Sequence, residues 1–120
     1  MEFVTSVDEW LNLPKLDIPV VKDEHHTGRV YRVVKAGMFL ADPDDCQKHN
    51  VAAEPNPTGK CVLPTCVIEE SDHGRELCQL PLDLAAWAEH VVGAAYLGAK
   101  LFPCDVEFGL LRDRTYAEIL

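Results

Sequence analysis

Cationic side chains are scarce in this chain. Eleven Lys and Arg stand against 20 Asp and Glu, which gives a formal net charge of −9 over 120 residues. Proteins gain most of their affinity for nucleic acids from Lys and Arg side chains that displace counterions from phosphates, so this composition argues against direct nucleic-acid binding. The partner expected from the charge is a basic protein surface.

Long, uninterrupted apolar runs are also lacking. The most apolar stretch, 84–102, carries Glu89 and His90 near its centre, and placing these side chains in hydrocarbon would be costly. The first residues include no basic start followed by an apolar core, which a secretion signal would show. We therefore expect no membrane span and a cytoplasmic protein.

The five cysteines form no obvious disulfide framework, because their number is odd and no secretion signal is evident. Cys46 and His49, followed by Cys61 and Cys66, have the outline of a zinc site in which two ligand pairs are joined by a longer arm. Pro64 is expected to break any strand between the second pair, so that both thiolates converge. The alternative is that these cysteines are ordinary core residues, since free cysteine is often buried.

Three helices are predicted from capping signals and apolar spacing. Ser6 and Glu9 suit a capping box, Asp42 followed by Pro43 suits a helix start, and Pro103 ends the third and longest helix. This long helix is apolar nearly all round, which predicts burial on both sides. The predicted helices lie near 6–13, near 43–52 and at about 82–100.

The remaining chain predicts two antiparallel hairpins and a C-terminal strand, so the expected fold is a single α+β domain over 1–120, packed on the long helix. Pro, Asn and Gly mark 54–60 as the clearest loop and the likeliest flexible segment. The first hairpin is expected from 29–35 and 38–41, the second from 65–70 and 75–80, the strand at 105–111, and a short helix from 115.

No motif in the sequence indicates catalysis. The chain has no glycine-flanked nucleophile turn, no Gly-rich phosphate loop and no metalloprotease spacing of His and Glu. His25 and His26 follow Asp23 and Glu24, but adjacent side chains in an extended segment point apart and cannot converge on one reacting atom. We therefore expect a non-enzymatic protein.

Carboxylates gather in two predicted elements and are the expected contact residues for a basic partner. Such attraction both speeds encounter and holds the complex, although the same charge also serves solubility alone. The leading hypothesis is an inhibitor of a nucleic-acid-handling protein, of the phage anti-defence (anti-CRISPR) or toxin-immunity type. The residues are Asp42, Asp44 and Asp45 at the second helix, and Glu69, Glu70, Asp72 and Glu76 at the second hairpin.

Two other hypotheses follow from the same sequence. One is a small zinc-stabilised adaptor domain for protein–protein interaction, organised by the Cys and His set described above. The other is a homodimer through the small and apolar residues Gly93, Ala94 and Leu97, which stand on the helix side where charged residues would be expected. This homodimer is compatible with either binding role.

Overall fold

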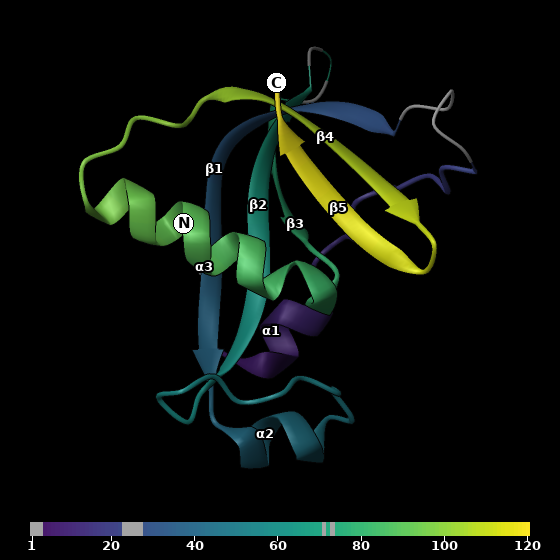
Figure 1. The fold of residues 1–120 in the computed structure, drawn as a ribbon. Helices are drawn as coiled ribbons and strands as arrows, with labels where there is room; N and C mark the ends of the chain where they lie inside the picture. The colour runs from purple at the N-terminus through teal and green to yellow at the C-terminus, as the bar shows by residue number, and fades with distance from the viewer. Residues whose placement is uncertain (1–3, 23–27, 71, 73) are drawn as a thin grey trace.

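A five-stranded antiparallel sheet organises the residues that this computed structural model describes, which are 4–22, 28–70, 72 and 74–120. The strand order is β3-β2-β1-β4-β5, and the helix α3 crosses one face of the sheet (Figure 1). The predicted single α+β domain is thus confirmed. The strands are β1 (Arg29–Ala41), β2 (Cys61–Glu70), β3 (Gly74–Gln79), β4 (Cys104–Leu111) and β5 (Arg114–Ile119); the helices are α1 (Val7–Leu11), α2 (Pro43–Lys48), η1 (Leu82–Leu84) and α3 (Ala85–Tyr96).

The first predicted hairpin is wrong, because its two arms form one continuous strand, β1. Gly37, which was expected in the turn, lies within the strand opposite Thr65 of β2. A Cβ built at Gly37 would lie 3.0 Å from the Thr65 Oγ1, so glycine allows the close approach of the two strands. A bulge between Val33 and Lys35 shifts the register and divides β1 into two halves.

The second predicted hairpin is confirmed as β2 and β3, although residues 71 and 73 of its turn lie outside the described residues. The strand β2 begins earlier than predicted and runs through Pro64, which was expected to break it. Proline fits here because the Pro64 carbonyl accepts hydrogen bonds from the Leu80 amide (3.1 Å) and the Trp10 indole (3.0 Å). Its backbone therefore points away from β1, and no bond to that strand is lost.

The C-terminal strand is confirmed as β4, but a helix from 115 is wrong, because these residues form β5. The turn between β4 and β5 is Arg112-Asp113, and both residues have positive φ (52° and 64°). Positive φ at both positions is the geometry of a two-residue hairpin turn, which usually carries Asn-Gly or Asp-Gly. Arg-Asp lacks that signal, which is why the hairpin was not predicted.

The two short predicted helices are present. The Ser6 hydroxyl accepts from the Glu9 amide (3.1 Å) at the start of α1, while the Glu9 carboxylate accepts from the Thr5 amide (3.0 Å) instead of closing the reciprocal bond on Ser6. The helix α2 begins at Pro43 as predicted but ends at Lys48, earlier than expected. Both helices therefore begin where they were predicted to begin, although only Ser6 makes a side-chain capping bond.

The prediction of one long buried helix is correct only in part. The segment folds as η1 followed by α3 and ends at Tyr96. Leu84, Ala88 and Val91 face the sheet and are buried, whereas Tyr96 is 91% exposed and Leu97 is 86% exposed. Its apolar composition therefore does not reflect burial on both sides, because no described element covers the outer side.

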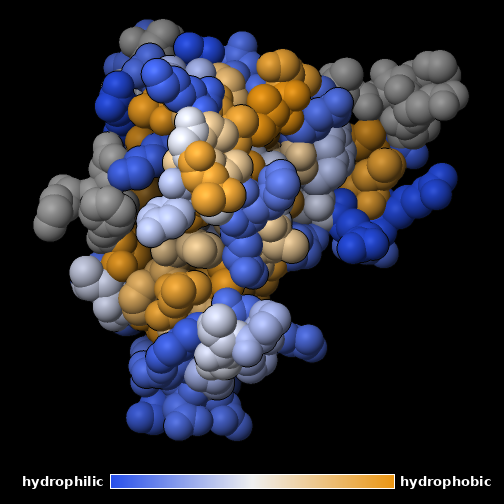
Figure 2. All heavy atoms as spheres, turned by 60° about the vertical axis from the view of Figure 1, so that its left-hand side comes forward, coloured by the Kyte–Doolittle hydropathy of each residue, from blue (hydrophilic) through white to orange (hydrophobic). Residues whose placement is uncertain are grey.

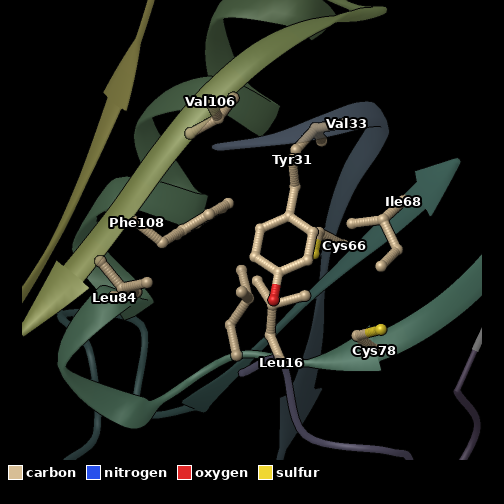
Figure 3. Close-up of a cluster of buried hydrophobic side chains, with 10 residues drawn as sticks. Leu16, Tyr31, Val33, Cys66, Ile68, Cys78, Leu84, Val106 and Phe108 are labelled. Atoms are coloured by element: carbon tan, nitrogen blue, oxygen red, sulfur yellow. The ribbon is translucent and has the colours of Figure 1, made fainter. Parts of the chain in front are cut away.

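Two clusters of buried side chains lie on opposite faces of the sheet. The larger cluster lies on the face that α3 covers, which we call the helix face (Figure 3). At its centre Phe108 makes edge-on ring contacts with Tyr31 (6.1 Å between centroids) and Trp87 (5.9 Å). The smaller cluster joins α1 and α2 to the α2 end of the sheet through Trp10 and Cys46, among others.

Candidate functional site

The two predicted acidic groups lie at opposite ends of β2. The strand starts near α2, which carries the first group, and ends at the β2–β3 hairpin, which carries the second (Figure 1). A strand of this length spans about 30 Å, so the groups cannot form one patch. They must be considered as two separate surfaces.

At the α2 end, two carboxylates are available to a partner. Asp42 occupies the N-cap position, where its side chain makes an ion pair with Lys60 and no capping bond. Asp44 and Asp45 are exposed in the first turn of α2, where carboxylates interact favourably with the helix dipole. Figure 2 shows that hydrophilic residues dominate this lower end of the molecule.

The loop 54–60 beside α2 is internally hydrogen-bonded. The Asn56 side-chain oxygen accepts from the Thr58 amide (3.0 Å) and the Lys60 amide (3.1 Å), and the Gly59 amide donates to the Asn56 carbonyl (2.8 Å). A short bridge between Pro55 and Cys61 ties the loop to the start of β2. These contacts hold Lys60 beside Asp42.

At the hairpin end, one row of charges is internally neutral. Arg75, Glu69, Arg32 and Asp105 stand side by side on β3, β2, β1 and β4, on the face opposite the helix face. Their signs alternate, and ion pairs join Arg75 to Glu69 (3.4 Å) and Arg32 to Asp105 (3.6 Å). Glu69 is therefore less available to a partner than the sequence predicted.

No described residue neutralises the other three carboxylates of the hairpin. Glu70 and Glu76 project on the helix face, on neighbouring strands, and Asp72 lies in the turn between those strands. Within the described residues, none of the three makes an ion pair; Glu76 accepts only a weak bond from the Cys78 thiol at 3.6 Å. Because Arg75 is engaged by Glu69, the hairpin presents a net negative surface.

A further acidic pair was missed by sequence reasoning. Glu107 and Glu118 stand directly opposite each other on β4 and β5. The Glu107 carboxylate accepts from the Gly28 amide (3.2 Å) and from the Tyr116 hydroxyl. Like charges in this arrangement repel each other, and a cationic partner would relieve the repulsion. The pair was missed because β5 was predicted as a helix.

The proposed zinc ligands are divided between the two cores. Cys46 and Cys61 lie together in the α2-end cluster, whereas Cys66 lies in the helix-face cluster and His49 is exposed at the end of α2. Because β2 continues through Pro64, the side chains of Cys61 and Cys66 point to opposite faces. Over the ranges described above, no three His, Cys, Asp or Glu side chains lie close enough to hold a metal ion.

Three buried thiols, those of Cys46, Cys66 and Cys78, have raised pKa values that favour the protonated form. Burial raises the pKa of Cys46 to about 11, with further contributions from Cys61 and Asp45. Burial, together with Glu76, raises the pKa of Cys78 to about 12, and burial also raises the pKa of Cys66. Since the thiolate is the form that binds metals and attacks electrophiles, these environments favour a packing role at neutral pH.

The predicted homodimer residues lie near the end of α3. Gly93 is exposed, Ala94 is half-buried, and Leu97 directly follows the helix with most of its side chain in solvent.

None of the helices in the described part of the chain is both long enough and apolar enough to cross a membrane. Comparisons with protein-family models, with curated proteins and with solved structures found no match for the chain.

Proposed function

We propose that this chain is a non-enzymatic acidic binding protein that occludes a basic surface of a partner. The observation that carries the proposal is the uncompensated group of Glu70, Asp72 and Glu76 at one hairpin, in a chain of net charge −9. Glu70 and Glu76 stand on paired strands, so the backbone that carries them needs little ordering when they bind.

The partner class proposed is a nucleic-acid-handling protein. Such proteins bind phosphate backbones in grooves lined by Lys and Arg, and a row of fixed carboxylates offers the same charge to those grooves. An inhibitor of the phage anti-defence or toxin-immunity type would act in this way. Electrostatic attraction between the two surfaces would speed their encounter.

The hairpin end is the proposed primary contact, and the α2 end is secondary. Arg75, the only Lys or Arg on β2 and β3, is already paired with Glu69. At the α2 end, Lys60 and Lys48 offset part of the charge of Asp42, Asp44 and Asp45. A partner that contacts both ends must present a basic surface about 30 Å long, the span of β2.

Charge reversal at the hairpin tests this proposal. The variant carries Glu70→Lys, Asp72→Lys and Glu76→Lys, and it is compared with the unmodified chain in capture from a lysate at low and high salt. We expect the unmodified chain to retain a nucleic-acid-binding protein at low salt, to release it at high salt, and to inhibit its nucleic-acid binding. The variant should lose both capture and inhibition.

A matched control separates the surface from the overall charge. Asp8→Lys, Glu54→Lys and Glu89→Lys change the net charge equally at three dispersed, exposed positions. This control should keep most of the capture. Equal capture by the hairpin variant and the control, insensitive to salt, would show that the hairpin carboxylates are not the contact.

A further inference from the structure

One long edge of the sheet has no partner strand among the described residues. The strand β1 pairs with β4 only over Arg29–Val33. Beyond the bulge, β1 continues to Ala41 with β2 on one side, and no described strand pairs with its other side (Figure 1). We call 36–40 the open edge.

The register shows which backbone groups face outward on the open edge. Pro64 stands opposite Met38, and its carbonyl accepts from the Leu80 amide, so this pair exchanges no hydrogen bonds. Bonded and non-bonded pairs alternate along an antiparallel ladder. Gly37 and Phe39 therefore bond to β2, whereas the amides and carbonyls of three residues point to the open side: Ala36, Met38 and Leu40.

The open edge lacks the charged residues and prolines that usually prevent an exposed strand from pairing with another chain. The other outer strands, β3 and β5, carry charged residues along their length, including Arg75, Glu76, Arg114 and Glu118. Charges and prolines on an edge disfavour pairing with another chain. The open edge is Ala-Gly-Met-Phe-Leu, with no charge and no proline.

A hollow and a protruding side chain lie on the same edge. The helix α3 extends past the outer side of β1 (Figure 1). A hollow of about 440 Å³ lies between them, lined by Ala36, Val92 and Ala95 among others. Leu40 lies further along on the same face as Ala36, with 45% of its surface exposed. Figure 2 shows hydrophobic side chains on this side, above the hydrophilic end.

We propose that a second copy of this chain pairs with the open edge, antiparallel, about a two-fold axis at Met38. Ala36 then stands opposite Leu40 of the second copy, and each Leu40 enters the hollow beneath the other copy's α3. The outward groups form about six backbone hydrogen bonds.

Self-complementarity selects a second copy over a foreign strand. The hollow lies beside Ala36 and the protruding side chain is Leu40, and a two-fold axis at Met38 places each of these opposite the other in the second copy. An isologous dimer requires this kind of self-complementary surface. This interface differs from the one predicted at Gly93, Ala94 and Leu97, because it uses the side of α3 that faces the open edge. The dimer requires nothing of the acidic hairpin, which lies at the other end of the sheet.

Charge placed at the axis tests both the dimer and its register. Met38→Lys and Met38→Glu are measured by sedimentation equilibrium, alone and mixed in equal amounts. Residue 38 faces itself across the axis, so each variant alone should be monomeric through like-charge repulsion, and the mixture should restore a dimer. Leu11→Lys, at an exposed apolar residue on α1, should remain dimeric like the unmodified chain.

A second variant probes the hollow without adding charge. Leu40→Ala removes the side chain that fills it in both copies, so the dimer Kd should rise about tenfold or more. An unmodified chain that stays monomeric at all concentrations, or dimers in both single-charge variants, would overturn the proposal. Because capture of a basic partner is measured on hairpin variants with an intact open edge, failure of one proposal leaves the other to be judged separately.

Discussion

The two halves of β1 belong to one strand but have different surroundings. Residues 29–33 all pair with β4, and Arg32 and Val33 pair with β2 as well. The inward side chains of this half, Tyr31 and Val33, are buried in the larger core. Residues 36–41 have β2 alone, and Leu40 remains 45% exposed. The bulge between Val33 and Lys35 separates the two environments.

The two halves of β1 also differ in their charged residues. The paired half carries Arg29 and Arg32, which form ion pairs with Asp17 and Asp105. The open half has no charged residue at 36–40. In the paired half, Asp105 on β4 and Asp17 before β1 supply the counter-charges. An uncovered apolar edge, in contrast, is prone to pair with another chain.

The largest difference between the halves should appear in packing. Phe108→Ala empties the core beside the paired half and should lower the free energy of unfolding by about 3–5 kcal/mol. Phe39→Ala, in the open half, removes a half-buried ring and should cost about 1–2 kcal/mol. Urea denaturation at dilute concentration measures both, and equal losses would remove the distinction between the halves.

Proline substitution at adjacent residues should separate the two sides of the open half. The Phe39 amide bonds to β2, so Phe39→Pro should cost on the order of 3 kcal/mol, well beyond Phe39→Ala. The Met38 amide points outward, so Met38→Pro should cost the monomer less than about 1 kcal/mol while preventing dimerisation. Urea denaturation measures the stability of the two variants, and sedimentation measures their dimerisation. A Met38→Pro variant that is as unstable as Phe39→Pro would show that the Met38 amide bonds within the sheet.

The smallest effect is expected from the charge row of the paired half. Arg32→Ala leaves Glu69 and Asp105 without their shared neighbour and should lower the free energy of unfolding by about 0.2–1 kcal/mol, less at high salt. Lys22→Ala removes the same charge from another exposed position and serves as the control. No difference between these variants at low salt would show that the row contributes nothing.

Local signals predicted the elements that depend on local chemistry. Ser6 and Pro43 marked the starts of α1 and α2, and the turn composition near Gly74 marked the β2–β3 hairpin. The errors arose where tertiary pairing decided the outcome. Gly37 has the composition of a turn but lies in a strand, and Arg112-Asp113 forms a tight turn without glycine.

The candidate sites were predictable only as residue types. The sequence identified the hairpin carboxylates, but not that Arg75 and Arg32 flank Glu69, because that row depends on the register of four strands. The zinc set depended on Pro64 breaking β2, and the direction of its carbonyl could not be read from sequence. The open edge was invisible for the same reason, since it depends on where the pairing with β4 stops.

Amide hydrogen exchange along β1, measured at low and high protein concentration, tests the open edge most directly. At low concentration, Gly37 and Phe39 should exchange slowly and Ala36, Met38 and Leu40 quickly, in strict alternation. At high concentration, the three fast amides should become protected. Protection of all five amides that does not change with concentration would contradict the account.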